Sequence, residues 1–559
     1  MHFLIRFVCL FITVGFVFDA IPQVSGQTFN ERMSDWPLDL KINGIVAICS
    51  DSEPSDEQVD YFRMANGDDA KVVTIQFGDN NDAEAATDRW GEDLTHYYAH
   101  LPAESMRKQA DSNLELTRLS DALEGATGVW IQADSQLSRE QKKLVLALSD
   151  DLHELVKRGG VVLGIGSVGQ SFGRHEIIGG QTFGDTRQAT IRRGLNLIPD
   201  SVVQLDFERE SAKPQLQGVL ASHPKMIGMG LDLGAMLVLR GRKIRVLGEG
   251  NAHFFTTAND RQPIRTKSLS SSSSRRVNPY ESMIDLTAWR RDAIDRTLPL
   301  FPPAQPIAPH VAEGTLMIIG GGGMPRGLMQ DFIERAGGEN ARLIYVPCSE
   351  RDEITTRDRR MVQSWLAAGV TSADVVHTKD RLQANSDEQF LKPLKRATGI
   401  FFGGGRQWNF ADSYYGTETH RLMKEVLNRG GVIAGSSAGA SIQAQYLARA
   451  NPLGNIDIMA PGYERGGLGF ITGVAIDQHF TQRRRQADMS SLVNRYPQIL
   501  GIGIDEQTAI VVNGSVAEVV GDGNVFMYNR ESYPADAKPD YYKLSEGDRY
   551  NLATRKLVE

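Results

Sequence analysis

The sequence predicts an α/β protein made of two tandem domains, each built of three layers around a mostly parallel sheet. Short β-branched runs such as Leu316–Ile319 and Gly399–Phe402 alternate with helical segments, an alternation typical of parallel sheets covered by helices on both faces. Residues 126–166 and 397–437 also share one pattern of strand, loop, amphipathic helix, Gly-Gly and strand, at an offset of 271 residues. A repeat of this length indicates a duplicated domain.

The duplicated segments also predict the domain boundaries. A second matching pair, 223–241 and 496–514, lies at an offset of 273 residues, so we expect one domain over 27–255 and the other over 313–559. The segment between them, 256–312, contains a serine run followed by a proline-rich stretch. Polar sequence of low complexity buries little apolar surface, so we predict a flexible linker there.

The first residues resemble a targeting segment. Arg6 precedes an apolar run over 7–18, and the small residues Val24-Ser25-Gly26 follow at cleavage-site spacing. This arrangement predicts a signal peptide over 1–26, and hence a secreted or periplasmic protein without an integral membrane span after cleavage. A single anchoring helix is the alternative, although the run is shorter than the roughly 20 residues that a span requires.

The remaining composition fits a soluble globular protein. Hydrophobic residues make up 41% of the 559 residues, which excludes a disordered chain, a collagen-like chain and a polytopic membrane protein. The formal net charge is −8, so no basic excess indicates a nucleic-acid partner. Signal cleavage removes Cys9 and leaves Cys49 and Cys348. We expect these two to be buried thiols, with one structural bridge as the alternative.

The sharpest chemical signal is a G-x-S-x-G pattern, Gly435-Ser436-Ser437-Ala438-Gly439, between the predicted strand Val432–Ala434 and a helix of small residues. A tight turn from strand to helix needs glycine where the backbone crowds itself, and it lifts the serine hydroxyl clear of the sheet. We therefore expect Ser437 to be a nucleophile and the amide of Ala438 to be one oxyanion donor. A plain loop is the alternative.

A nucleophilic serine needs a base, and the base needs an acid that orients it. His479 closes the predicted strand Gly473–Ile476 within Asp477-Gln478-His479, and Glu506 follows the predicted strand Ile499–Ile504. Ligand sites in parallel sheets lie beyond the carboxyl ends of the strands. His479 and Glu506 are therefore candidates for the base and the acid.

Two glycine runs also follow predicted strands. The loop Gly403-Gly404-Gly405-Arg406-Gln407 is expected to supply a second oxyanion donor, Gly405, and a polar substrate contact, Gln407; a flexible turn is the alternative. The run Gly320–Gly323 is not followed by Gly-Lys-Ser/Thr, so we predict no nucleotide loop. No His, Cys, Asp or Glu set has metal-ligand spacing, and we expect no metal or other cofactor.

Four motifs in order, FFGGGRQ, GSSAGA, DQHFTQRRR and GIDEQTA, resemble the cyanophycinases of peptidase family S51, a family that also includes aspartyl dipeptidases of peptidase E type. The resemblance covers most of 313–559. It implies a flavodoxin-like, class I glutamine amidotransferase-like fold. By matching position it implies a nucleophile, a general base and an orienting acid at Ser437, His479 and Glu506. The family positions associated with substrate binding are Gln407, Asp477, Gln478, Arg483 and Arg485.

One position departs from the family pattern. The family usually carries a third arginine after the histidine, whereas this sequence has Asp488 there. Cyanophycin is a polyaspartate backbone with arginine attached to each side-chain carboxyl, and its free carboxylates suit bidentate pairing with arginine. An acid at this position is expected to weaken such pairing.

The N-terminal copy lacks the same residues. By the repeat offsets, Gly166, Asp206 and Leu233 stand where Ser437, His479 and Glu506 stand in the other copy. We therefore expect this copy to be catalytically silent. Its expected role is that of a pseudo-dimer partner within the chain; a homodimer is the other assembly that the family suggests.

These observations predict an exported serine exopeptidase that hydrolyses cyanophycin or related aspartyl peptides to β-Asp-Arg dipeptides through an acyl-enzyme. One alternative is an aspartyl or isoaspartyl dipeptidase of peptidase E type. The other is a non-catalytic protein in which both copies only bind a ligand; the complete set Ser437, His479 and Glu506 disfavours it.

Overall fold

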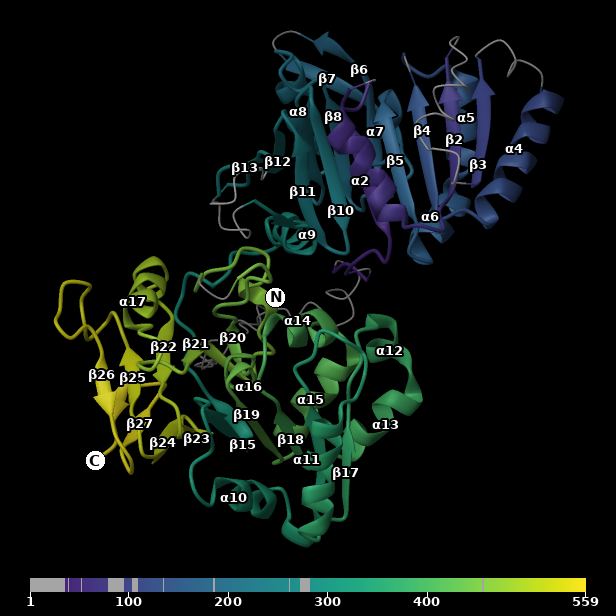
Figure 1. Ribbon diagram of the computed structural model, residues 1–559. Helices are drawn as coiled ribbons and strands as arrows, with labels where there is room; N and C mark the ends of the chain where they lie inside the picture. The colour runs from purple at the N-terminus through teal and green to yellow at the C-terminus, as the bar shows by residue number, and fades with distance from the viewer. Residues whose placement is uncertain are drawn as a thin grey trace, which may run out of the picture.

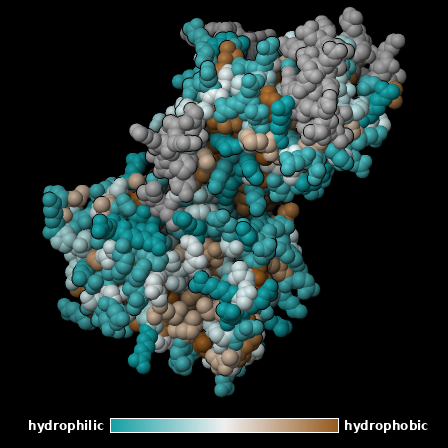
Figure 2. Space-filling view, in the orientation of Figure 1, coloured by the Kyte–Doolittle hydropathy of each residue, from teal (hydrophilic) through white to brown (hydrophobic). Residues whose placement is uncertain are grey.

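The described residues form two lobes joined at a narrower waist (Figures 1 and 2), with hydrophilic residues over most of the visible face. The computed structural model describes residues 36–38, 40–51, 53–78, 95–102, 109–133, 135–183, 186–260, 262–271, 282–454 and 457–559. The predicted signal peptide lies outside them. Within these ranges, no helix is long and apolar enough to cross a membrane.

The N-terminal lobe contains two sheets. The larger has the order β14-β11-β10-β1-β5-β4-β2-β3, in which β1, β5, β4, β2 and β3 pair in parallel and β10, β11 and β14 are joined by antiparallel pairing. The smaller has the order β13-β12-β9-β8-β6-β7. The strands are β1 (Ile45–Cys49), β2 (Lys71–Phe77), β3 (Thr95–Leu101), β4 (Gly128–Ala133), β5 (Val161–Gly166), β6 (His175–Phe183), β7 (Thr186–Arg193), β8 (Ser201–Leu205), β9 (Ile227–Leu231), β10 (Ala235–Arg240), β11 (Lys243–Gly248), β12 (Ala252–Thr256), β13 (Arg265–Leu269) and β14 (Ile284–Asp285). The helices are α2 (Asp56–Asn66), α4 (Gln109–Glu124), α5 (Arg139–Ala147), α6 (Ser149–Lys157), α7 (Ser167–Gln170), α8 (Ala212–Ser222) and α9 (Leu286–Asp295).

The C-terminal lobe repeats this plan. Its larger sheet has the order β17-β16-β18-β19-β15-β23-β24-β27-β28 and its smaller sheet the order β20-β21-β22-β25-β26. The strands are β15 (Val311–Ile319), β16 (Arg342–Val346), β17 (Ser372–Val375), β18 (Gly399–Phe402), β19 (Val432–Ser436), β20 (Ala444–Tyr446), β21 (Ile471–Gln478), β22 (Leu500–Ile504), β23 (Thr508–Gly514), β24 (Val516–Gly521), β25 (Val525–Tyr528), β26 (Tyr542–Leu544), β27 (Arg549–Asn551) and β28 (Lys556–Leu557). The helices are α10 (Leu328–Arg335), η2 (Gly338–Asn340), α11 (Thr356–Ala367), α12 (Arg381–Ser386), α13 (Glu388–Arg396), α14 (Trp408–Tyr414), α15 (Glu418–Asn428), α16 (Ala438–Ser441), η3 (Glu464–Gly466) and α17 (Gln486–Arg495).

The strand orders match between the lobes. The run β3-β2-β4-β5-β1-β10-β11 of the first larger sheet corresponds to β17-β16-β18-β19-β15-β23-β24 of the second, and β6-β8-β9-β12-β13 corresponds to β20-β21-β22-β25-β26. The predicted α/β class with mostly parallel strands is confirmed. Each copy also holds a second sheet, which the sequence did not predict.

Both faces of the larger C-terminal sheet are buried. Along β15, Leu316 and Ile318 belong to one apolar cluster, while Met317 and Ile319 belong to another on the opposite face. Because side chains alternate across a strand, this division places the sheet between two apolar layers. An all-apolar strand is the sequence signature of this arrangement.

The segment 256–312 differs from the predicted linker. It contains β13, which pairs with β12, and β14, which pairs with β11, so both extend the N-terminal sheets. The proline-rich part packs on the C-terminal lobe, where the Phe301 ring stacks on Tyr446 at 6.0 Å and Gln498 donates to the Pro303 carbonyl. Residues 272–281, which include much of the serine run, lie outside the described residues; edge pairing and ring packing hold the described parts of the segment in place.

Candidate active site

The nucleophile elbow has the predicted strand–turn–helix form. Ser437 follows β19 and precedes α16, with φ 58° and ψ −113°, a region that non-glycine residues rarely adopt. A Cβ on Gly435 would lie 2.2 Å from the Gly439 carbonyl oxygen, and one on Gly439 would lie 2.2 Å from the Phe402 carbonyl oxygen. The glycines of the motif are therefore required by close backbone contacts. The Ser437 amide donates to the Ile319 carbonyl at 3.0 Å and fixes the turn.

His479 and Glu506 reach the elbow from the smaller sheet. The strands β21 and β22 pair in parallel with Gln478 opposite Ile504, so the residues that follow them emerge side by side. His479 Nε2 lies 2.9 Å from Ser437 Oγ, and His479 Nδ1 lies 2.6 Å from Glu506 Oε1. The site thus forms where the carboxyl end of β19, in the larger sheet, meets those of β21 and β22, in the smaller sheet.

The glycine run after β15 packs directly against this chain of hydrogen bonds. A Cβ on Gly321, at φ 100°, would lie 2.4 Å from His479 Cε1, and one on Gly322, at φ 65°, would lie 2.4 Å from Glu506 Oε2. The Gly320 carbonyl accepts from the His479 amide at 2.9 Å. Sequence reasoning considered this run only as a phosphate loop. Its position shows that it makes room for the imidazole and the carboxylate.

Gly321→Ala is therefore expected to lower kcat by about a hundredfold, because the methyl group would displace the imidazole from Ser437 and misplacements of about 1 Å carry costs of that order. Gly327→Ala is the matched control: Gly327 has a similar φ of 82°, with nothing within 4 Å of the added Cβ. Steady-state kinetics of both variants would distinguish a clash with His479, expected only in Gly321→Ala, from the strain of alanine at positive φ, expected in both. Equal losses in the two variants would contradict the crowding argument.

The two expected oxyanion donors come from the turn at Ser437 and from the loop after β18. Ala438 is buried and is the first residue of α16. In the loop after β18, a Cβ on Gly404 would lie 3.4 Å from Ser437 Cβ, whereas one on Gly405 would lie 2.9 Å from Cys348 Cβ. Gly404 therefore lies beside Ser437, and Gly405, the residue selected from the sequence, lies beside Cys348.

Of the five expected substrate-binding residues, four are buried and one is exposed. Asp477 is fully buried and accepts from Arg485 Nη1 at 2.7 Å and from Arg449 Nε at 2.8 Å. Gln478 Oε1 also accepts from Arg485. Gln407 donates to the Ala448 carbonyl at 2.8 Å and the Arg449 carbonyl at 2.9 Å. Arg483 is the exposed member.

Arg449, which sequence reasoning did not single out, connects this network to Asp488. Its Nη2 donates to Asp488 Oδ2, while its Nε donates to Asp477. The Arg449 side chain is 3% exposed and that of Asp488 is 46% exposed. Asp488 is thus paired within the chain. The two residues are 39 apart in sequence, so their spacing gives no sign of the contact.

The protonation of His479 follows from its surroundings. Burial lowers the pKa of His479, and the charges of Arg483 and Arg485 lower it further, while the hydrogen bond to Glu506 raises it; the net pKa lies below the ordinary value. A depressed pKa keeps the imidazole neutral to lower pH, and the neutral form is the one that can accept the serine proton.

We therefore expect kcat/KM to fall on acidification with a midpoint below about 6.5, the ordinary histidine pKa. Arg483→Met should move this midpoint upward, because it removes a positive charge that disfavours the imidazolium. Arg484→Met serves as the control, since Arg484 is exposed and is not among the groups that shift His479. A midpoint that stays in place in Arg483→Met would contradict this electrostatic account.

Both described cysteines are free thiols. Burial raises the pKa of Cys49 and of Cys348 to about 12. Cys348 Sγ lies beside the glycine loop and donates to the Arg406 carbonyl at 2.9 Å. Because the thiolate is the nucleophilic form, Cys348 does not compete with Ser437 near neutral pH. Within the described ranges no cluster of three or more His, Cys, Asp or Glu side chains could hold a metal ion.

The N-terminal copy keeps the backbone of the site without its side chains. Gly166 has φ 61° and Asp206 has φ 51°, close to the 58° of Ser437 and the 50° of His479. Leu233, in the place of the acid, is 53% exposed. The turn geometry therefore belongs to the fold, and the chemistry is present in only one copy.

The loop after β1 differs between the copies. Cys49 pairs with Ile165 just before Gly166, and Ile319 pairs with Ser436 just before Ser437. By this register, Asp51 takes the place of Gly321. The Asp51 side chain accepts from the Gly234 amide at 3.0 Å, so this copy has a bonded carboxylate at the position where the other copy has no side chain.

Comparison with known proteins identifies the lobe that carries the site: residues 316–520 match the model of peptidase family S51. The C-terminal lobe, called the S51 lobe below, is similar to this family over those residues. The cyanophycinase of Geminocystis herdmanii is 29% identical over 244 residues, which are 41% of this chain and 89% of that protein. The cyanophycinase of Synechococcus elongatus is 29% identical over 263 residues, which are 44% of this chain and 81% of that protein.

The chain also matches a solved structure in part. The crystal structure of a peptidase from an acI-B1 Actinobacterium is 21% identical, covers 43% of this chain and 98% of its own, and has a TM-score of 0.32. The family match and the cyanophycinase relatives support a serine-type peptidase.

Proposed function

We propose that the S51 lobe is a cyanophycinase-like exopeptidase that uses Ser437 as the nucleophile, His479 as the general base and Glu506 as the orienting acid. The observation that carries the proposal is the continuous hydrogen-bond chain from Ser437 Oγ through His479 to Glu506, at 2.9 and 2.6 Å. The strained elbow backbone at Ser437 supports it, because such strain gathers at functional sites.

In the proposed reaction, His479 Nε2 takes the proton from Ser437 Oγ as the oxygen attacks the scissile carbonyl. Backbone amides at Ala438 and in the loop after β18 stabilise the oxyanion. Glu506 stabilises the imidazolium, which then protonates the leaving amine as the C–N bond breaks. Water, deprotonated by His479, attacks the acyl-enzyme ester, and the second product leaves with its new carboxylate while Ser437 regains its proton.

Exposed arginines near the site favour an anionic peptide substrate. Arg483 follows His479 by four residues, and its amide donates to the His479 carbonyl at 3.0 Å. Arg406 is exposed at the end of the glycine loop, with its guanidinium 5.6 Å from the centre of the Trp408 ring. Two cations at the mouth of the site would attract free carboxylates such as those of cyanophycin.

Asp488→Asn is expected to raise kcat/KM on cyanophycin severalfold at low ionic strength. The change removes a half-exposed negative charge and weakens the internal pairing of Arg449, so carboxylates on the substrate meet less repulsion. Because salt screens exposed charges, the gain should shrink at high ionic strength. Unchanged kinetics at low salt would mean that Asp488 does not face the substrate.

The substrate class is tested by supplying the purified chain with cyanophycin or with β-aspartyl dipeptides. Release of β-Asp-Arg from cyanophycin, with little turnover of the dipeptides, is the expected result. Preferential turnover of the dipeptides would favour an enzyme of peptidase E type, and no turnover of either would favour a ligand-binding protein. Ser437→Ala is the control for contaminating peptidases.

We also propose that the chain is exported by a signal peptide over residues 1–26. The support is the arrangement of Arg6, the apolar run and the small residues that follow. Mass spectrometry of the mature N-terminus is the test. Full-length chains in the cytoplasmic fraction would contradict export.

A further inference from the structure

The helix that follows the active-site loop also contacts the N-terminal lobe. All seven residues of α14 are buried. Gln407 caps its N-terminal end and follows the glycine loop, in which Gly404 lies beside Ser437. Asp412 lies five residues after Gln407, or about 7.5 Å along a helix. One short buried helix thus joins the catalytic loop to the surface between the lobes.

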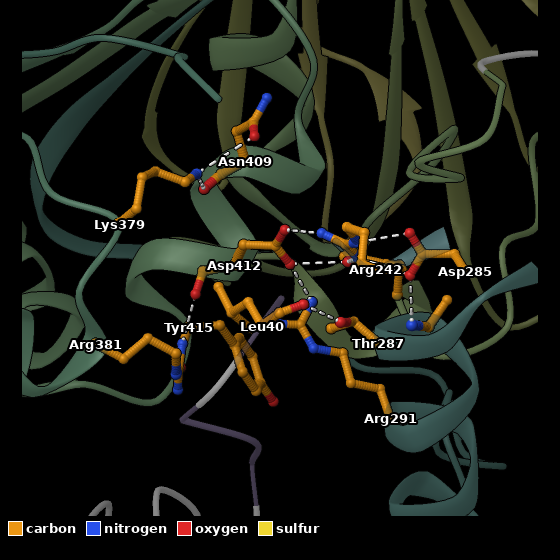
Figure 3. A network of polar contacts seen from close by, with 12 residues as sticks. Leu40, Arg242, Asp285, Thr287, Arg291, Lys379, Arg381, Asn409, Asp412 and Tyr415 are labelled. Carbon is orange, nitrogen blue, oxygen red and sulfur yellow. Dashed lines mark hydrogen bonds and ion pairs between the residues drawn. The ribbon is translucent and has the colours of Figure 1, made fainter. Parts of the chain in front are cut away.

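Two arginines of the N-terminal lobe bind the Asp412 carboxylate (Figure 3). Arg242 Nη1 donates to Oδ2 at 2.6 Å, and Arg291 Nη1, from α9, donates to Oδ1 at 2.6 Å. Tyr463 of the C-terminal lobe donates to Oδ1 at 2.8 Å. Arg291 is fully buried and the Asp412 side chain is 3% exposed. Both oxygens of a buried carboxylate are therefore bonded to the other lobe.

The electrostatics match this geometry. Burial alone would raise the pKa of Asp412, but Arg242, Arg291 and Lys379 outweigh it and hold the pKa well below its ordinary range. Asp412 is thus ionised at neutral pH. A buried ionised carboxylate is unstable without its partners. Removal of Arg242 or Arg291 would therefore destabilise the position of Asp412 and of α14, which carries it.

The S51 lobe holds the rest of α14 from the other side. Arg381 donates to the Asp412 carbonyl at 2.9 Å and to the Tyr415 carbonyl at 2.8 Å. Lys379 donates to the Asn409 carbonyl at 3.2 Å and to its side-chain oxygen at 3.3 Å. These contacts are part of the network in Figure 3. The helix is thus held by cations from both lobes.

The contact between the lobes is also close in shape. A Cβ on Gly462, at φ 86°, would lie 2.1 Å from the Ala288 carbonyl oxygen of α9. The Arg291 guanidinium lies 4.0 Å from the centre of the Trp36 ring and 4.7 Å from that of Tyr463. The guanidinium is thus confined between rings as well as bonded to Asp412, which fixes α9 on the S51 lobe.

We propose that Arg242 and Arg291 are positioning residues for the S51 reaction: through Asp412 they hold α14, and with it the loop 403–407, against Ser437. The silent copy is then part of the catalytic apparatus without touching the substrate. The effect on catalysis rests on the proposed function of Ser437. The effect on the position of the loop does not depend on that proposal.

The test compares Arg291→Met with Arg290→Met in the full chain. Arg290 is the neighbouring residue on α9, is also buried, and pairs with Asp200 inside its own lobe at 2.7 Å. Each variant removes the ion pair of one buried arginine, but only the Arg291 pair includes a residue of α14. One readout is hydrogen exchange of peptides that cover 403–414. The other is the rate at which diisopropyl fluorophosphate labels Ser437, measured by mass spectrometry.

For Arg291→Met we expect faster exchange over 403–414 and labelling slower by about tenfold or more, with both close to wild type in Arg290→Met. Cyanophycin kinetics should then show a lower kcat with KM little changed. Exchange equal to wild type, or the same change in both variants, would overturn the proposal. Faster exchange with unchanged labelling would overturn its catalytic part.

Failure of the proposed function and failure of the variant to fold can each be distinguished from failure of this proposal. A wild-type chain that takes no label at Ser437 counts against the proposed function, while the exchange data still decide the positioning. If Arg291→Met does not fold, Arg291→Lys takes its place: it keeps the charge but loses the planar guanidinium fork. The lysine variant should show the same changes in smaller measure, and wild-type behaviour in both readouts would overturn the proposal.

Discussion

Ser437→Ala should abolish hydrolysis, with kcat lower by about a millionfold, the order seen when a triad nucleophile is removed. Alanine keeps the Cβ that the elbow already accommodates at φ 58°, so the turn should survive. What is lost is the oxygen 2.9 Å from His479 Nε2, and with it the acyl-enzyme. Initial rates on cyanophycin, with circular dichroism to verify folding, are the measurement.

Ser436→Ala is the matched control, because it removes a hydroxyl from the neighbouring residue at the end of β19. It should keep wild-type activity to within a few-fold. If the Ser437 variant retained even a tenth of the wild-type rate, the assignment of the nucleophile would be wrong. If the Ser436 variant lost activity equally, the elbow as a whole, and not one oxygen, would be responsible.

Glu506→Gln is expected to lower kcat by about ten-thousandfold, the order seen when the acid of a triad becomes an amide. The amide nearly preserves shape but cannot stabilise the imidazolium across the 2.6 Å contact with His479 Nδ1. Gly322 leaves room for the Glu506 side chain, because an added Cβ there would lie 2.4 Å from Oε2, and the amide should fit in the same place.

The pH profile gives this variant a second readout. The hydrogen bond and charge of Glu506 raise the pKa of His479, so their loss should move the acid midpoint of kcat/KM to lower pH. Glu518→Gln, an exposed change on β24, should alter neither kcat nor the midpoint. A Glu506→Gln variant with a normal midpoint would mean that the carboxylate does not act on the imidazole.

Sequence reasoning reached the elbow because its signal is local. The G-x-S-x-G spacing reflects the steric requirements of a single turn. His479 and Glu506 follow predicted strands, whose ends lie near that turn. The Gly320–Gly323 run and the pairing of Arg449 with Asp488 could not be found in this way. They depend on chains that approach from distant parts of the sequence, and a glycine run has the same appearance whether it faces a phosphate or an imidazole.

The domain plan shows the same limit. The repeat at a constant offset predicted two similar α/β copies, because helix and strand periodicity survives the loss of chemistry. It did not predict the second sheet of each copy, because its strands are short and pair with partners that are distant in the sequence. The buried contact of Asp412 with two arginines was also beyond reach, since an aspartate in the sequence carries no mark of its burial.

Asp51, which stands in the N-terminal copy where Gly321 stands in the other, has a consequence for evolution. Recovery of a second active site would need Gly166→Ser, Asp206→His and Leu233→Glu together with Asp51→Gly, and none of these steps restores a complete triad by itself. Selection cannot reward the single changes for catalysis, so such a copy does not gain a second active site stepwise. Its surface against the S51 lobe is constrained by other contacts, such as that of Arg242 with Asp412.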